Sequence, residues 1–208
     1  MKKILLFLMS VIVFTACNSC NKSQENVAEV VKDSVVAIDV EHTIAMDRQS
    51  MYLKFGEEYR WYETDILLPE FLDSENVTSN PVELVNIFQG IIEKGNGFDT
   101  WVFKFQHFPD GTVLTDSING FWIENMPLND EVIKLKYTEA YDRIMQTNSP
   151  KPHSKHVTLR NPIGPVAINT QWIFGNIREQ LWCDVVTGEI RNSNPAFPNL
   201  NTPLGEWP

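Results

Sequence analysis

The sequence predicts an α+β fold, in which an antiparallel sheet, or two such sheets, is packed by one helix per sheet. Short runs of aromatic and β-branched residues predict the strands, and Gly, Pro, Asn and Asp between these runs predict tight turns. Two stretches with apolar residues at three- and four-residue spacings predict the helices. The chain has 208 residues, of which 43% are hydrophobic and 11% aromatic, and this is sufficient to bury a core.

The N-terminus predicts export and lipid attachment. Two lysines precede an apolar run from Ile4 to Phe14, a pattern typical of a signal peptide and too short to span a bilayer comfortably. The following Thr15-Ala16-Cys17 completes a resemblance to a bacterial lipobox, with Phe14 where leucine is usual. Residues 1–16 are therefore expected to be a lipoprotein signal peptide, and Cys17 the lipidated residue that anchors the chain to a membrane. An ordinary signal peptide or a short anchor helix is the alternative.

Residues 17–50 are expected to contain the lipidated cysteine, a polar tether and a linker, although Val27 to Ile44 also fits a first strand. With Cys17 acylated, Cys20 and Cys183 remain as thiols, and Cys183 is expected to be buried and inert. A disulfide between them would require the tether to fold back over the body of the protein. The formal net charge is −10, which excludes nucleic acid as a partner because phosphate binding needs clustered Lys and Arg.

The N-terminal α+β unit is expected at 51–130. It begins with a strand-like aromatic run, Met51 to Leu68, that is broken at Gly56. A helix is predicted from Pro81 to the residue before Gly95, because Asn80 suits the N-cap and an apolar stripe follows. An alternating strand then leads into a hairpin turn and two short strands, at Thr100–Phe108, Pro109–Gly111, Thr112–Leu114 and Phe121–Ile123.

The C-terminal unit, 131–208, repeats this order. A helical stripe over Tyr137–Met145 precedes strands at His156–Arg160, Gln171–Phe174 and Leu181–Val186, and an irregular tail rich in Pro and Asn begins at Asn192. A tandem helix-plus-three-strand repeat is therefore a hypothesis. The last strand and its turn, Asp184-Val185-Val186-Thr187-Gly188-Glu189, resemble the end of PepSY-type modules. The resemblance covers about residues 131–191 and implies a non-catalytic domain that binds or regulates envelope peptidases.

Few residues of the sequence are candidates for catalysis or metal binding. His153 and His156 are the only close histidine pair and are weak candidates for a metal site, because lysines flank them and no acid or cysteine is near; no metal and no cofactor are expected. Two short motifs, Asp33-Ser34-Val35 and Asp116-Ser117-Ile118, resemble the O-glycosylation acceptor of Bacteroidota, with Ser34 and Ser117 as the acceptors. His107 is isolated in the sequence.

The features together predict a non-catalytic lipoprotein of the cell envelope, held by lipid in the outer membrane and facing the periplasm or the surface. Its expected partner is another envelope protein, such as a peptidase. The alternative is a surface lipoprotein that captures glycans or nutrients with exposed aromatic side chains, since rings such as those of Trp122, Trp172 and Trp182 can stack on sugars. An enzyme is the third and least favoured alternative, because the sequence contains no motif typical of a hydrolase and no phosphate-binding loop.

Overall fold

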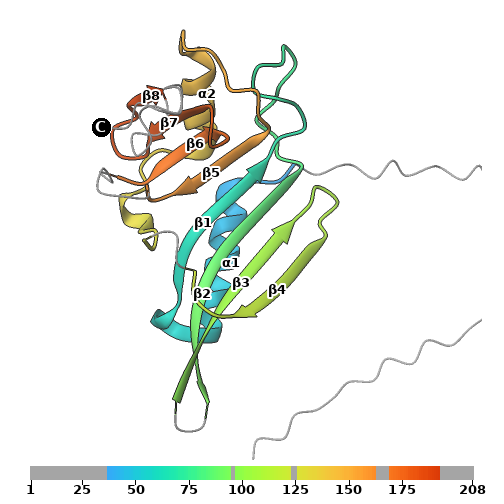
Figure 1. The fold of residues 1–208 in the computed structure, drawn as a ribbon. Helices are drawn as coiled ribbons and strands as arrows, with labels where there is room; N and C mark the ends of the chain where they lie inside the picture. The colour runs from blue at the N-terminus through green and yellow to red at the C-terminus, as the bar shows by residue number, and fades with distance from the viewer. Residues whose placement is uncertain (1–36, 95–96, 123–125, 163–168, 193–208) are drawn as a thin grey trace, which may run out of the picture. The chain divides into compact units, whose positions relative to one another are not determined.

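Eight antiparallel strands form one sheet in the computed structural model of the chain, and two α-helices pack on the same face of this sheet (Figure 1). The structure describes residues 37–94, 97–122, 126–162 and 169–192. The α+β class is thus confirmed, with the strands of both halves joined in a single sheet. The elements in chain order are α1 (Val40–Phe55), the 3-10 turn η1 (Gly56–Glu58), β1 (Arg60–Leu67), β2 (Glu83–Lys94), β3 (Gly97–His107), β4 (Val113–Asn119), the 3-10 turn η2 (Asp130–Val132), α2 (Tyr137–Gln146), β5 (His156–Arg160), β6 (Gln171–Gly175), β7 (Gln180–Asp184) and β8 (Ile190–Asn192).

The strand order is β4-β3-β2-β1-β5-β6-β7-β8. Each helix is therefore followed by four strands that pair in sequence, and the two sets of four meet through β1 and β5. These two strands are antiparallel, with Glu63 opposite Arg160 and Leu67 opposite His156. As a result, β4 and β8 form the two outer edges of the sheet.

Helix α1 corrects the expectation of a linker or strand before residue 50 and of a strand from Met51. Asp39 caps its N-terminus by accepting a hydrogen bond from the backbone N–H of His42 at 3.0 Å. The helix ends at Phe55 and is followed by Gly56 as its C-cap, whose φ of 59° is unfavourable for residues with a Cβ. Its buried side is partly polar, which hides the helical periodicity in the sequence; the buried residues are Val40, Thr43, Ile44, Asp47 and Met51.

Strand β2 corrects the helix predicted from Pro81. Leu84 and Phe88 face the helices while Ile87 lies on the opposite face, and all three are buried. Apolar residues on both faces of a central strand occupy consecutive positions, so they imitate the three- and four-residue spacing of a helix. The capping signals at Asn80 and Pro81 therefore precede a strand.

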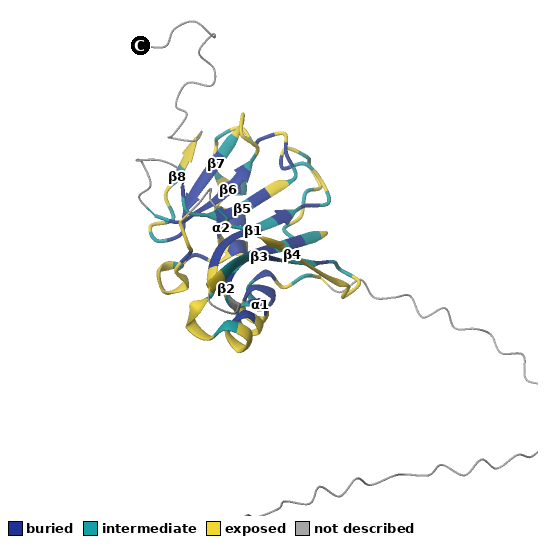
Figure 2. Ribbon diagram, turned by 60° about the horizontal axis from the view of Figure 1, so that its bottom comes forward, coloured by how far each residue is buried: buried dark blue, intermediate teal, exposed yellow. Residues whose placement is uncertain are grey.

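Several other elements follow the prediction, but β4 is longer than the predicted strand Thr112–Leu114, and β8 was not predicted. Helix α2 and strands β3, β5, β6 and β7 lie where the sequence places them, and Gly111, with φ of 81°, closes the predicted β3–β4 turn. The pair Phe121-Trp122 is not a strand. The core between helices and sheet is rich in rings: Tyr137 packs on Trp172 with centroids 5.5 Å apart, and Phe55 on Phe103 at 5.1 Å. Dark blue, buried segments run through the middle of the sheet in Figure 2.

Candidate functional site: an open groove beside the edge strand β4

An open groove of about 630 Å³ lies on the sheet where β1 to β5 come together. Residues on its floor, such as Val85 and Ile87, alternate along β2 with those that face the helices, so the groove lies on the face opposite α1. Strand β4 forms one side and Trp122 stands over the same face. The lining residues are Asp65, Ile66, Leu67, Glu83, Val85, Ile87, Lys104, Gln106, Leu114, Thr115, Asp116, Trp122 and His156.

The groove carries more negative than positive charge. Asp65, Glu83 and Asp116 contribute carboxylates, and Lys104 contributes an ammonium group. Asp65 accepts a hydrogen bond from the hydroxyl of Thr158 at 2.7 Å, and Glu83 accepts one from the amide of Gln106 at 2.9 Å. These bonds fix the carboxylates as acceptors on the floor of the groove, which suits a ligand that brings donors or positive charge.

Trp122 forms the aromatic wall of the groove. Its backbone N–H donates to the Gln89 side chain at 3.1 Å, and the Lys104 ammonium lies 5.5 Å from the centroid of its ring. Its indole Nε1 is buried and has no hydrogen-bond partner among the described residues. The other two tryptophans expected as sugar-stacking candidates, Trp172 and Trp182, are each only 2% exposed and belong to the interior.

Strand β4 is an exposed edge. All seven of its residues are exposed, including the apolar side chains of Leu114 and Ile118, at 53% each (Figures 1 and 2). Within the described part of the chain, no strand pairs with its outer side. Edge strands of this kind present unpaired backbone groups to any strand that approaches.

The direction of the β4 backbone groups follows from the register. The N–H of Phe108 donates to Thr112 at 3.0 Å, and that of Gly120 donates to Thr100 at 2.8 Å, which marks these as hydrogen-bonded pairs. Because such pairs alternate in antiparallel sheets, the bonded positions on β4 are Leu114, Asp116 and Ile118. The positions that direct their N–H and C=O groups away from β3 are Val113, Thr115, Ser117 and Asn119.

One of these outward groups is already capped. The N–H of Ser117 donates at 2.7 Å to the carboxylate of Asp116, the residue before it. Ser117, the predicted O-glycosylation acceptor, thus lies in the middle of the exposed edge, while Ser34 lies outside the described residues. Asp116 is the only charged residue of β4, so one side chain both carries the negative charge of this strand and caps the Ser117 N–H.

A buried polar network lies on the other face of the sheet, beneath α1. Asp47 of α1 accepts hydrogen bonds from the Asn86 amide at 2.7 Å and lies 2.8 Å from Nε2 of His107; Asn86 in turn accepts one from Thr64 at 2.5 Å. All four residues are less than 9% exposed. His107 is therefore not isolated, as its position in the sequence had indicated, but paired with an acid 60 residues away.

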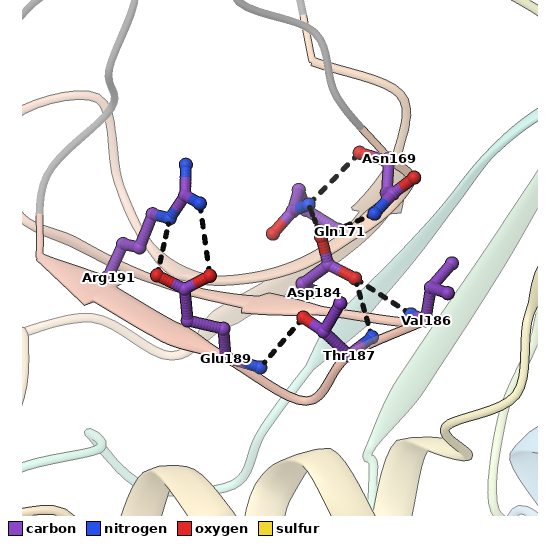
Figure 3. Close-up of polar contacts among 7 residues, drawn as sticks. All are labelled: Asn169, Gln171, Asp184, Val186, Thr187, Glu189 and Arg191. Atoms are coloured by element: carbon purple, nitrogen blue, oxygen red, sulfur yellow. Dashed lines mark hydrogen bonds and ion pairs between the residues drawn. The ribbon is translucent and has the colours of Figure 1, made fainter.

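The turn that carries the family resemblance is held by Asp184 (Figure 3). One oxygen of this carboxylate accepts the backbone N–H groups of Val186 at 2.8 Å and Thr187 at 2.9 Å, and the other accepts the side-chain amides of Asn169 at 2.9 Å and Gln171 at 3.2 Å. Burial opposes ionisation of Asp184, but these hydrogen bonds outweigh it and hold the pKa of the carboxyl below its usual range. Both oxygens are thus occupied in supporting the turn.

The two candidate metal ligands are not brought into a common site. His153 is stacked on Phe71, with ring centroids 4.0 Å apart, and its Nδ1 lies 3.0 Å from an oxygen of Asp73. His156 begins β5 and faces the groove. Among the described residues, no group of three or more His, Cys, Asp or Glu side chains is placed to hold a metal ion.

Cys183 is a free thiol with no exposed surface, and burial raises its pKa to about 11. Cys17 and Cys20 lie outside the described residues. No helix of the described residues has both the length and the apolar character needed to cross a membrane.

Comparison with protein-family models gives no match for the chain, and searches of curated proteins and of solved structures give no significant match either.

Proposed function

We propose that this chain is a lipid-anchored, non-catalytic envelope protein that binds another envelope protein by adding a strand of that partner to β4. The observation that carries the proposal is the outer edge of β4, which no strand of the described residues pairs with, which is exposed along its whole length and which lies beside the groove. In strand addition, backbone hydrogen bonds supply affinity and pockets for alternate side chains supply specificity. An exposed edge next to a groove on one face offers both.

Lipid attachment is the part of the proposal that rests on the sequence alone. The apolar run from Ile4 to Phe14 and the lipobox-like residues before Cys17 support it. Cells that express the full chain should incorporate radiolabelled palmitate into it, and Cys17→Ala should abolish the label. Retention of the label in Cys17→Ala would contradict lipidation at this residue.

Strand addition is tested at Thr115, whose N–H points away from β3. A photo-crosslinking amino acid at Thr115 of the full chain should capture an envelope protein, whereas the same group at exposed Thr138 of α2 should not. In a second experiment Thr115→Pro, which removes the outward N–H but no hydrogen bond to β3, should abolish capture from a crosslinker at Ile118. The control Thr115→Val keeps the N–H and should preserve capture. Equal capture by the Pro and Val variants would overturn the proposal.

Glycan capture is a second candidate, favoured by Trp122. Its ring lines the groove beside the polar side chains of Asp65 and Gln106, and its buried Nε1 lacks an acceptor among the described residues. A sugar could stack on the ring and bond these groups. Quenching of tryptophan fluorescence by a panel of polysaccharides, lost in Trp122→Ala, would support this function, and absence of quenching across the panel would exclude it for those polysaccharides.

Two finer proposals concern the origin of the fold and the kind of partner. A helix followed by four sequentially paired strands occurs twice, which fits a duplicated unit, although the sequence had indicated three strands in each copy. The second copy, with α2 and the Asp184 turn, is the part that resembles PepSY-type modules. That resemblance favours a peptidase as the partner, although β4 itself lies outside the part of the chain that resembles these modules.

A further inference from the structure

We infer that the partner strand bound at β4 is basic at its centre, and that this basic residue releases the cap on Ser117. The inference deepens the proposed function and rests on it. The occupant is an extended protein segment in which an apolar, a basic and a further apolar side chain alternate along one face.

The alternation follows from the side chains of β4 that lie on the groove face. Leu114, Asp116 and Ile118 lie on the same face as the groove, and none of their backbone groups points to the free edge. In pairing with an added strand they would occupy the non-hydrogen-bonded positions, where facing side chains are closest. Each would therefore contact the side chain directly opposite, and opposite charges stabilise such pairs whereas like charges destabilise them.

The charges around Asp116 favour a cation on its outer side. Lys104 is its cross-strand neighbour on the inner side, but the Lys104 ammonium lies over the Trp122 ring, 5.5 Å from its centroid. Lys54 of α1 also lies near this edge, on the face of the sheet that the helices cover. Its ammonium is 4.5 Å from the centroid of the Phe103 ring. Glu83 and Asp65 add negative charge to the floor of the groove. A lysine or arginine of the partner would thus meet a predominantly acidic surface.

Asp116 couples this charge recognition to backbone pairing. In the unbound protein its carboxylate accepts the outward N–H of Ser117, and a charged residue at this position is a recognised way of protecting an edge from unwanted strands. When a basic side chain draws the carboxylate toward itself, the N–H of Ser117 becomes available to a carbonyl of the partner. A neutral or acidic strand would have to break the Asp116 to Ser117 bond without this compensation.

The test uses two blocked peptides, Thr-Ile-Thr-Lys-Thr-Ile-Thr and the same sequence with Glu in place of Lys, titrated into the isotopically labelled protein. Binding is followed by the backbone amide resonances of Val113, Thr115, Ser117 and Asn119. The lysine peptide should bind about three- to tenfold more tightly than the glutamate peptide, and 0.5 M salt should reduce the difference. Asp116→Lys should reverse the preference, while Asp142→Lys, the same charge change on the exposed side of α2, should leave it unchanged.

Asp116→Asn separates the two roles of the residue, because it retains an oxygen that can accept the Ser117 N–H but carries no charge. The preference for the lysine peptide should disappear in this variant. If both peptides shift the β4 amides with equal affinity in the unmodified protein, the inference of a basic partner is wrong while strand addition stands. If neither peptide perturbs these amides at millimolar concentration, strand addition itself fails, and the inference fails with it.

Discussion

The carboxylate of Asp47 and the imidazole of His107 lie 2.8 Å apart in an interior where neither residue is more than 7% exposed. The pair joins α1 to the end of β3, and Asn86 of β2 donates to the same carboxylate oxygen. A single side chain of the helix therefore satisfies polar groups on two neighbouring strands.

Asp47→Ala should destabilise the fold by about 3–5 kcal/mol, because it leaves buried polar groups of Asn86 and His107 without their acceptor. Urea unfolding measures the loss. The control Gln49→Ala, on the exposed side of the same helix, should change stability by less than about 0.5 kcal/mol. A cost for Asp47→Ala no larger than that of the control would show that the network does not stabilise the fold.

Gly90 is required by the ring of Phe55. A Cβ built on Gly90 would lie 2.9 Å from that ring, so Gly90→Ala should cost about 1–3 kcal/mol. The penalty should shrink in a Phe55→Leu background, measured as a double-mutant cycle. Gly97→Ala has no atom within 4 Å of the added Cβ and serves as the matched control; an equal cost at the two glycines would rule out a clash with the ring.

Cys183 should not react in the folded protein. Its thiol has no exposed surface, and a pKa of about 11 leaves little thiolate at pH 8. Iodoacetamide at pH 8 should modify Cys183 only after addition of guanidinium chloride, as determined by mass spectrometry of the peptide that contains it. Rapid labelling without denaturant would contradict the packing described for β7.

Asp184 should make stability depend on pH. Its pKa is lower in the folded chain than in the unfolded chain, where the pKa of an aspartate is about 3.9. Its ionisation therefore stabilises the fold fully above about pH 4, and this contribution is lost as pH falls through the folded-state pKa. The destabilisation by Asp184→Asn should thus be larger at pH 6 than at pH 3. A pH-independent cost at Asp184 would refute the argument.

Asp116 should keep the free edge from pairing with copies of itself. Removal of the only charge on β4 in Asp116→Thr leaves exposed Leu114 and Ile118 beside an uncapped backbone. The sedimentation coefficient of this variant should rise with protein concentration more steeply than that of the unmodified chain. Asp142→Thr is the control for the change in net charge, and identical behaviour of the two variants would show that Asp116 does not protect the edge.

The sequence predicts those parts of the fold whose periodicity comes from one buried face. In α2, apolar residues occupy one side only, so Tyr137, Ala140 and Ile144 indicate the helix correctly. The hairpin at Gly111 is also predicted, because few residues other than glycine adopt its backbone conformation. The β class of β5, β6 and β7 follows from their short β-branched and aromatic runs.

The failures have physical causes in particular residues. Leu84, Ile87 and Phe88 are buried on two faces of β2, so their spacing imitates a helix, although Val85, Ile87 and Ile91 favour a strand. Helix α1 buries Asp47 and Thr43, which weakens its apolar stripe. The site depends on strand order, which places β4 at an edge and Trp122 over the groove, and no local pattern in the sequence indicates either.

The meeting of β1 and β5 at the centre of the sheet also bears on how the chain folds. All other strand pairs join neighbours in sequence, so they close short loops. The β1–β5 pair, which is the seam between the two sets of four strands, is the exception. Across it the Thr158 hydroxyl donates to Asp65, which is 93 residues away in the chain. Long-range pairings are the slow ones to form, so we expect each set of four strands to assemble with its own helix before the two sets dock. The strength of this seam then decides whether the halves unfold in one cooperative transition or in two.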